Sequence, residues 1–228
     1  MDRLQHRLPG NISETIGSRK REACVRSHLE RQVHRVLAFV ICMTAFFVSP
    51  RIACAQVPTY DVTPEESSIK FGVDSSVSIK GNFEKWNASI KFSSRDVRTA
   101  VLDIEIQADS VSTGSHIKDN KLKGKDFFNV KESPTITFKS TKIVQTGPST
   151  FDIEGNFTIR GVTKTEKLTL TSDSKGTPTG SLDGIMAFDR KDYGMTSGIP
   201  FIKIANRVEV NVRLKWRRVS GPPPEFQQ

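Results

Sequence analysis

Apolar and polar residues alternate with a period of two along most of this chain, from Tyr60 to Trp216. The run Leu102–Gln107, for example, reads LDIEIQ. A strand produces this pattern when one of its faces is buried and the other is solvated. Strands with one wet face are typical of antiparallel sheets. Comparable runs occur at residues 69–73, 77–83, 88–92, 135–139, 151–160, 168–170, 182–188 and 208–216.

Eight or nine such runs are present, and no stretch has the apolar spacing of an amphipathic helix of three turns. Turn-forming residues separate the runs, as in Thr146–Pro148 and Lys175–Pro178. Because open sheet edges invite aggregation, a sheet of this size usually folds into a sandwich or closes into a barrel. The pattern therefore predicts an all-β protein and leaves both architectures open.

Residues 108–138 interrupt the alternation with small polar residues, a lysine-rich stretch and an aromatic pair. Lys118, Lys121 and Lys125 fall at helical spacing, which predicts a short helical segment near residues 118–128. Over the end of a closed sheet, these lysines would form a positive rim for a phosphate or carboxylate head group. An ordinary solvated face is the alternative.

Residues 1–55 have the features of an export signal. A basic region precedes 13 apolar residues, Val36–Val48, which is shorter than the roughly 20 residues of a transmembrane helix. Ala53–Ala55 supplies small residues for cleavage after position 55. A lipoprotein anchor on Cys54 is the rival interpretation, and Arg51 disfavours it. We therefore expect a periplasmic or secreted mature chain without an integral membrane span.

Without residues 1–55, the chain has a smaller net charge and fewer reactive side chains. Residues 1–55 contain nine of the 34 basic and four of the 25 acidic residues, so the remainder has net charge +4 rather than +9. This small excess gives no support to a nucleic-acid partner. All three cysteines and three of the four histidines also lie there, which leaves His116 as the mature chain's one histidine. We expect no metal, no cofactor and no catalysis; an enzyme that uses His116 is the weaker option.

The inward-facing positions are rich in phenylalanine, which points to an apolar binding cavity. An eight-stranded barrel is wide enough inside for side chains alone or for one small ligand. Strand glycines, such as Gly81 and Gly155, would leave room inside. A hydrocarbon chain gains roughly 0.8 kcal/mol per buried CH₂. The residues expected to line the cavity are Phe71, Val73, Phe83, Phe92, Ile104, Ile106, Phe128, Phe138, Phe157, Ile159, Met186 and Phe188.

Four segments, in order and at matching spacing, resemble motifs of the YceI family of lipocalin-like secreted proteins. Thr113–Gly114 with Lys118–Asn129 is similar to that family's R-D-x-H-L and D-F-F-D segment, and Ser133–Phe138 to its Y-P-x-I-x-F. Phe157–Lys164, FTIRGVTK, is close to its L-T-I-R-G-V-T-K, and Arg190–Met195 resembles R-x-D-F-G-I. The resemblance covers residues 59–215.

The chain departs from the family pattern at four places. Many members carry a histidine after the first strand, where this chain has Asp74–Ser76. Lys118 replaces an arginine, Lys121 a common histidine and Asn129 an aspartate.

The resemblance implies a single extended, eight-stranded, antiparallel lipocalin-like barrel over residues 56–217, with one continuous apolar tunnel. It implies a long-chain isoprenoid or other fatty amphiphile as the ligand. The proline-rich residues 218–228 are expected to be disordered. The head group is expected to meet side chains at the tunnel mouth, namely His116, Lys118, Asp119, Lys121, Arg190 and Tyr193.

Two functions fit these expectations. The first is a secreted or periplasmic protein that holds the lipid for transport, storage or stress protection. The second is a non-catalytic structural or stress-response interaction protein whose barrel is filled by its own side chains. The oligomeric state stays open, with a homodimer as one option.

Overall fold

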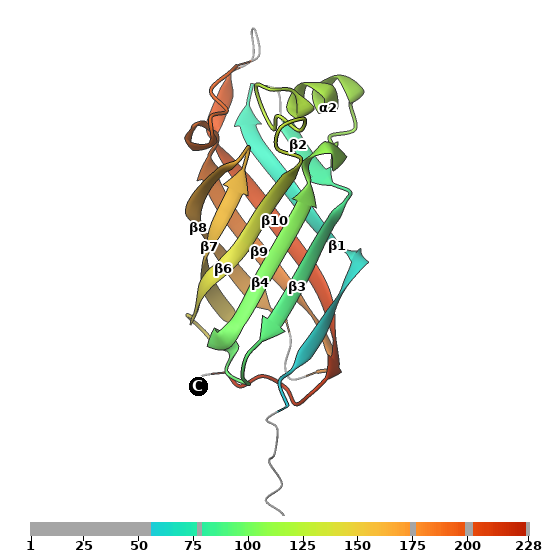
Figure 1. Ribbon diagram of the computed structural model, residues 1–228, viewed down its shortest axis with the longest axis vertical. Helices are drawn as coiled ribbons and strands as arrows, with labels where there is room; N and C mark the ends of the chain where they lie inside the picture. Colours follow the sequence, from blue (N-terminus) through green and yellow to red (C-terminus); the bar gives the residue numbers. More distant parts are fainter. Residues whose placement is uncertain (1–55, 77–78, 174–176, 199–202, 227–228) are drawn as a thin grey trace, which may run out of the picture. The chain divides into compact units, whose positions relative to one another are not determined.

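The computed structural model describes residues 56–76, 79–173, 177–198 and 203–226 (Figure 1). The expected signal peptide and its cleavage position lie outside the described residues. The strands are β1 (Thr59–Ser75), β2 (Ile79–Phe83), β3 (Trp86–Phe92), β4 (Ala100–Gln107), β5 (Val111–Ser112), β6 (Thr135–Gln145), β7 (Thr150–Ile159), β8 (Val162–Ser172), β9 (Thr179–Asp189) and β10 (Ile204–Ser220). The helices are η1 (Val97–Thr99), η2 (Ala108–Ser110), α2 (His116–Lys123) and η3 (Arg190–Tyr193).

The sheet closes into a barrel because β10 pairs with both β9 and β1. β2 and β3 are two halves of one strand along β1, since Phe83 lies opposite Ile69 and Lys91 lies opposite Thr59. β4 and β5 are likewise two halves of one strand, which pairs with β3 and β2. Counted in this way, the barrel has eight antiparallel strands. This confirms the predicted lipocalin-like barrel and excludes the sandwich.

The two divided strands break at the same level of the barrel wall, and Ser110 bridges the breaks. The Ser110 hydroxyl accepts from the backbone N–H of Lys85 at 3.0 Å and donates to the carbonyl of Gln107 at 2.7 Å. Its own carbonyl accepts from the N–H of Glu84. Buried backbone groups need such partners. The wall therefore bends here without leaving the sheet open.

The predicted helical segment is shorter than expected. α2 ends at Lys123 because Gly124 has extended backbone dihedral angles, and its N–H donates to the carbonyl of Lys121 at 3.1 Å. Residues 124–130 then turn back, with the Phe128 N–H bonded to the Leu122 carbonyl at 2.9 Å. This places Phe127 and Phe128 in the core. α2 lies over one end of the barrel, here called the helix end (Figure 1).

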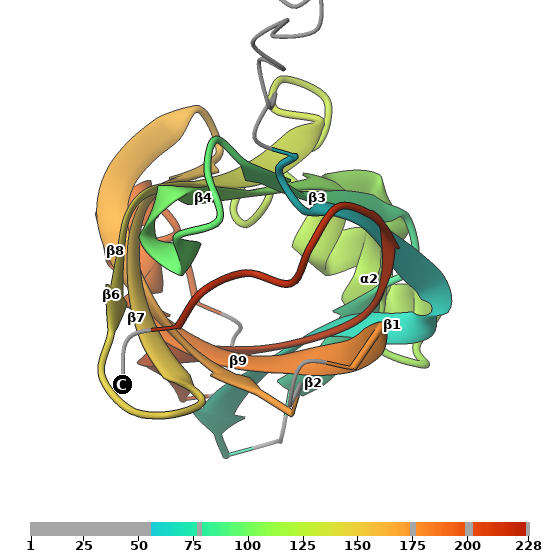
Figure 2. The same cartoon turned by 90° about the horizontal axis from the view of Figure 1, so that it is seen from below.

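Residues 218–226, which were expected to be disordered, follow a described path in the structure. β10 continues to Ser220, and residues 221–226 cross the opposite end of the barrel, here called the tail end (Figure 2). The Glu225 N–H donates to the carbonyl of Arg95 at 2.7 Å, and the side chains of these two residues form an ion pair at 2.9 Å. Phe226 packs on Phe151 with ring centroids 6.0 Å apart. An aromatic contact and backbone pairing offset the ordering cost that the proline-rich composition alone suggested.

Two glycines within strands, Gly155 and Gly81, lie against large side chains rather than beside empty space. A Cβ built on Gly155 would lie 2.5 Å from the ring of Phe138 and 2.8 Å from the backbone oxygen of Lys139. Phe71 crowds Gly81 in the same way. These glycines therefore permit close packing of large rings rather than a void.

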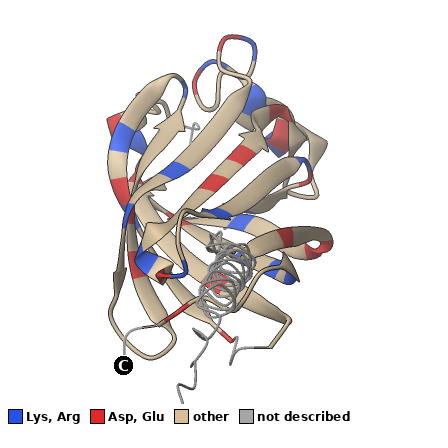
Figure 3. Cartoon of the chain, turned by 60° about the horizontal axis from the view of Figure 1, so that its bottom comes forward, with Lys and Arg blue, Asp and Glu red and all other residues tan. Residues whose placement is uncertain are grey.

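Charged side chains of both signs are interspersed over the outside of the barrel (Figure 3). Several form exposed cross-strand ion pairs, such as Lys167 with Asp152 at 3.0 Å. Exposed pairs of this kind add little to stability. Across the described part of the chain, no helix combines the length and the apolar character that a membrane span requires.

We predict that Gly155→Ala destabilises the barrel by about 1–3 kcal/mol, because the new methyl group must displace the Phe138 ring or the backbone of β6. The matched control is Gly72→Ala, whose Cβ would meet only the side chain of Lys80 at 3.9 Å. Urea unfolding of the two variants measures the difference. Equal stabilities would show that Phe138 does not need the space above Gly155.

Candidate ligand-binding cavities

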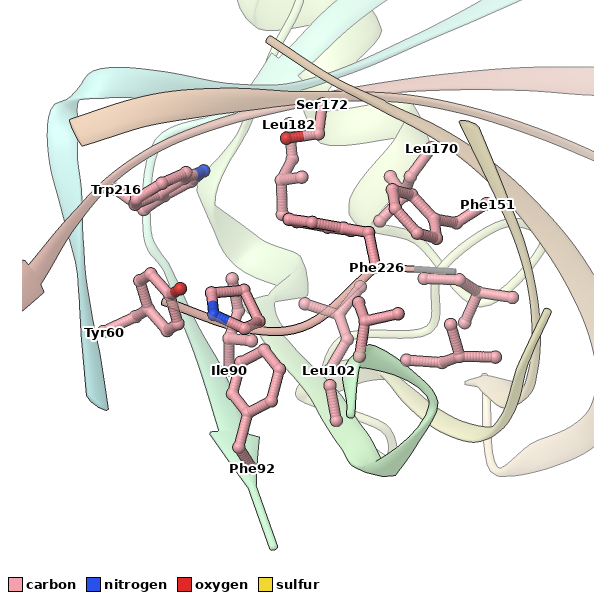
Figure 4. Close-up of a pocket in the computed structure, with 15 residues that line it drawn as sticks. Tyr60, Ile90, Phe92, Leu102, Phe151, Leu170, Ser172, Leu182, Trp216 and Phe226 are labelled. Carbon is pink, nitrogen blue, oxygen red and sulfur yellow. The ribbon is translucent and has the colours of Figure 1, made fainter. Parts of the chain in front are cut away.

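Among the described residues, side chains of the barrel line two apolar cavities, one near each end. The helix-end cavity has an empty volume of about 690 Å³ and the tail-end cavity about 630 Å³, both including space open to solvent. The helix-end cavity is lined by Ile69, Phe71, Val73, Ile79, Phe83, Ile106, Leu122, Phe127, Phe128, Ile136, Phe157, Ile159, Phe188, Arg190, Met195, Ile204, Val208 and Val210. The tail-end cavity is lined by Tyr60, Ile90, Phe92, Val97, Ala100, Leu102, Ile143, Phe151, Ile153, Leu170, Ser172, Leu182, Trp216, Pro224 and Phe226 (Figure 4).

A layer of packed side chains separates the two cavities. They share no lining residue, and the strands reach them in order from end to end. On β4, Ile106 lines one cavity and Leu102 the other, and Ile104 between them is buried and lines neither. The middle layer also contains the buried residues Ala88, Phe138, Leu168, Met186, Val212 and Leu214. The structure therefore has buried side chains between two cavities, where one continuous tunnel was expected.

The twelve residues expected to line the cavity fall into three groups. Only Phe92 lines the tail-end cavity. Ile104, Phe138 and Met186 belong to the middle layer and line neither of the two cavities. The other eight line the helix-end cavity: Phe71, Val73, Phe83, Ile106, Phe128, Phe157, Ile159 and Phe188. A ligand contact at any of them stays a prediction.

The turn after α2 completes the wall of the helix-end cavity. Phe128 lies 5.7 Å from Phe83 and 6.2 Å from Phe71, measured between ring centroids. These three rings come from β1, β2 and the turn, so the cavity wall depends on the position of α2. Leu122, buried on the inner side of α2, adds an aliphatic contact to the same wall.

Arg190 is the one charged side chain among the described residues that line the helix-end cavity. It is only 6% exposed, and it has no carboxylate partner among the described residues. Its Nε donates to the carbonyl of Ala205 at 3.1 Å, and its Nη1 donates to the carbonyls of Met195 and Ser197. Within the described residues its Nη2 has no partner. Arg190 therefore borders the cavity, but the surface that it presents there is apolar, and its bonded nitrogens point to backbone carbonyls.

Asp119 and Tyr193, both expected at the mouth, are engaged in internal hydrogen bonds. Asp119 is buried and accepts from the hydroxyl of Thr113 at 2.6 Å and from its N–H at 2.8 Å. The hydroxyl bond is the main cause that holds the pKa of this carboxyl below its usual range. Tyr193 is fully buried behind Phe157 and Phe188, and its hydroxyl donates to Glu166 at 2.7 Å. Burial raises the pKa of the Tyr193 hydroxyl.

The remaining mouth residues lie on the outside of α2. His116, Lys118 and Lys121 are exposed, and none of them lines the cavity. Lys121 pairs with Asp126 at 2.9 Å and lies 5.8 Å from the ring centre of Phe127. The described residues contain no group of three or more His, Cys, Asp or Glu side chains placed to hold a metal ion.

The barrel agrees with a match to a known protein family. The model of the YceI-like domain matches residues 60–216, which is most of the chain. The chain belongs to the YceI-like domain family.

Curated relatives of this YceI-like chain include UPF0312 proteins. One from Pseudomonas aeruginosa is 33% identical over 120 residues, which are 50% of this chain and 62% of the relative. One from Azotobacter vinelandii is 34% identical over 84 residues, which are 37% of this chain and 44% of the relative. The chain thus spans less than two thirds of either relative.

Solved structures repeat the YceI-like barrel. The Campylobacter jejuni YCEI protein is 26% identical, with a TM-score of 0.53 over 63% of this chain and 86% of that one. Burkholderia cenocepacia BcnA is 24% identical, with a TM-score of 0.62 over 68% and 99%. A polyisoprenoid binding domain from Saccharophagus degradans is 13% identical, with a TM-score of 0.55 over 71% and 99%. At these identities the last two establish the fold alone.

The tail-end cavity of this YceI-like barrel was not predicted from the sequence. The contact of the C-terminal tail with this cavity was not predicted either, although Phe226 is the one aromatic residue after Trp216. Aromatic residues at the strand ends away from α2, such as Tyr60 and Phe151, could have indicated this cavity. Strand periodicity shows which face these residues occupy, but it does not show at which height in the barrel they meet.

We predict that Asp119→Ala destabilises the protein by about 1–3 kcal/mol at neutral pH, because it leaves the Thr113 donors without their acceptor. The pKa of Asp119 is lowered in the folded state, so its stabilising contribution is complete above the ordinary pKa of about 3.9 and is lost as the pH falls through the lowered value. The stability difference between wild type and variant should therefore narrow in acid.

Urea unfolding at pH 7 and in acid measures this difference. Asp126→Ala, which breaks an exposed ion pair on the same segment, is the control and should change stability little. A wild-type to Asp119→Ala difference that is constant with pH would contradict the role of the charged carboxylate.

Proposed function

We propose that this protein is a non-catalytic binding protein for an amphiphile, with the apolar chain in the helix-end cavity and the polar head at Arg190. The observation that carries the proposal is the buried Arg190 side chain, which lies beside a cavity whose surface is entirely apolar. A buried charge is costly without a partner, and oxygen anions such as phosphate and carboxylate match the donor geometry of arginine. A head group of this kind would use the Nη2 donors.

The apolar part of the cavity supplies the affinity. Its wall is entirely apolar, and its empty volume of about 690 Å³ includes space open to solvent. Each buried CH₂ contributes roughly 0.8 kcal/mol, so a chain of several isoprene or methylene units binds without further polar contacts. A chain longer than the cavity would have to displace Phe138 and Met186 from the middle layer.

The isoprenoid class is favoured by a neighbour with the same fold, the Saccharophagus degradans domain named for polyisoprenoid binding. With the expected export signal, this supports a periplasmic or secreted protein that carries or stores a long-chain isoprenoid or a related amphiphile. Catalysis has no support, since His116 is exposed on α2 and lies outside both cavities.

The filled middle layer favours a second candidate, a structural or stress-response interaction protein. In that case the cavities would be packing imperfections, and wall substitutions would change stability without changing the binding of any ligand. The next experiment separates the two.

We predict that wild-type protein binds geranylgeranyl phosphate and that Val210→Phe weakens this binding at least tenfold. Val210 is a half-buried residue on the wall of the helix-end cavity, so the larger ring takes the space of the chain. The matched control is Ile90→Phe, a half-buried residue on the tail-end wall, which should bind as the wild type does. Native mass spectrometry and titration calorimetry provide the measurement. Absence of binding to the wild type would favour the structural candidate.

We also predict that Arg190→Gln removes the preference for geranylgeranyl phosphate over geranylgeraniol, because the neutral amide loses the charge-assisted hydrogen bonds. Arg190→Lys keeps the charge and should retain part of the preference. Since Arg190 also binds three backbone carbonyls, the unfolding temperature of each variant is measured in parallel. An unchanged preference in a folded Arg190→Gln protein would exclude this residue as the head-group site.

A further inference from the structure

The tail-end cavity has an aromatic wall. Five of its lining residues carry aromatic rings: Tyr60, Phe92, Phe151, Trp216 and Phe226 (Figure 4). The rings of Tyr60 and Trp216 meet edge to face with centroids 4.9 Å apart, and those of Tyr60 and Phe92 are 5.4 Å apart. Ring faces and edges arranged around one space favour a flat, compact guest, because aromatic groups pair best in offset or edge-to-face contacts.

Besides the hydroxyl of Ser172, the side chains of Tyr60 and Trp216 bring hydrogen-bond donors to this apolar wall. In the described structure, neither the hydroxyl of Tyr60 nor the indole N–H of Trp216 has a hydrogen-bond partner. Figure 4 shows the Tyr60 oxygen and the Trp216 nitrogen at the edges of their rings, around a cavity whose surface is almost entirely apolar. Burial raises the pKa of the Tyr60 hydroxyl, so this group stays protonated at neutral pH. A guest with one acceptor oxygen would give these donors a partner.

The C-terminal tail forms the floor of the same cavity. Pro224 and Phe226 line it, and the tail reaches this position through two backbone hydrogen bonds of Glu225 with the Arg95–Val97 segment. The ion pair between Arg95 and Glu225 is exposed at the outer side. The floor is thus a short segment held by a few contacts, unlike the rest of the wall, which consists of paired strands.

The middle layer makes the tail-end cavity independent of the helix-end cavity. Ile104, Phe138 and Met186 lie between them, and a guest in one cavity touches no lining residue of the other. Occupancy of the two spaces by different molecules is therefore sterically compatible.

We infer that the tail-end cavity is a second binding site, separate from the proposed lipid site, for a compact aromatic molecule with one hydrogen-bond acceptor, and that residues 221–226 are its lid. The aromatic rings hold the flat body of the guest, and Tyr60 and Trp216 donate to its acceptor. The guest enters when the Phe226 side chain and its short segment swing away from Phe151, and the lid then closes over it. This site does not depend on the proposed lipid function.

The test uses the fluorescence of Trp216. Trp86, the other tryptophan, lines neither cavity, and Trp86→Phe leaves Trp216 as the single reporter. The probe is 4′-bromoacetophenone, whose bromine and ketone quench an indole on contact. We expect saturable quenching with a Kd in the micromolar range. We expect at least tenfold weaker binding of 1-bromo-4-ethylbenzene, which has the same shape but lacks the acceptor.

Wall and lid variants locate the bound probe. In the Trp86→Phe background, Ile90→Phe should weaken quenching at least tenfold, whereas Val210→Phe in the helix-end cavity should leave it unchanged. Phe226→Ala should speed dissociation of the ketone in stopped-flow measurements, since it removes the ring from the lid. Leu182→Phe serves as a second filling variant if Ile90→Phe does not fold.

Saturation with geranylgeranyl phosphate should leave the affinity for the ketone unchanged. Non-saturable quenching, equal effects of Ile90→Phe and Val210→Phe, or competition by the prenyl phosphate would each overturn the inference. If the ketone binds and the prenyl phosphate does not, the proposed lipid function fails and the second site stands.

Discussion

The backbone pairing between β1 and β10 is the constraint on which the rest of the structure depends. These are the first and last strands, each of 17 residues, and they pair from Thr59 opposite Ser220 to Ser75 opposite Ile204. Three register shifts occur along this pairing, and at the largest the Ser67 hydroxyl accepts from the Lys215 N–H at 2.8 Å. A closed sheet has no free edge, and its closure forces all inward faces to share one narrow interior.

That narrow interior explains why the cavities lie at the ends. Around the middle of the barrel, side chains from opposite walls meet, and large residues such as Phe138 and Met186 fill the available width. Towards each end the wall alone cannot close the space, so a separate segment covers it: α2 with its turn at one end and residues 221–226 at the other (Figures 1 and 2). Both candidate sites are therefore bounded by the least extensively paired parts of the chain.

Much of the fold was predictable because strand alternation is a local property. The run Leu102–Gln107 places its apolar residues inside in the structure, as its period of two requires. The path of the tail was not predictable, because composition describes a proline-rich segment as disordered and says nothing of the contact between Phe226 and Phe151, which is 75 positions earlier. Tyr193 was placed at the mouth for a similar reason, since nothing in its neighbourhood of the sequence shows that Glu166 binds its hydroxyl.

The sequence by itself determined which residues face inward, that the barrel is all-β, and that the chain after residue 55 has no cysteine and one histidine. These properties follow from residue types and from their spacing along one strand. Only the tertiary structure decided which inward residues border empty space, that Arg190 is buried beside an apolar cavity, and that the tail closes the far end. The physical reason is that free volume and unpaired donors arise where side chains from strands distant in sequence meet, and no local pattern encodes that meeting.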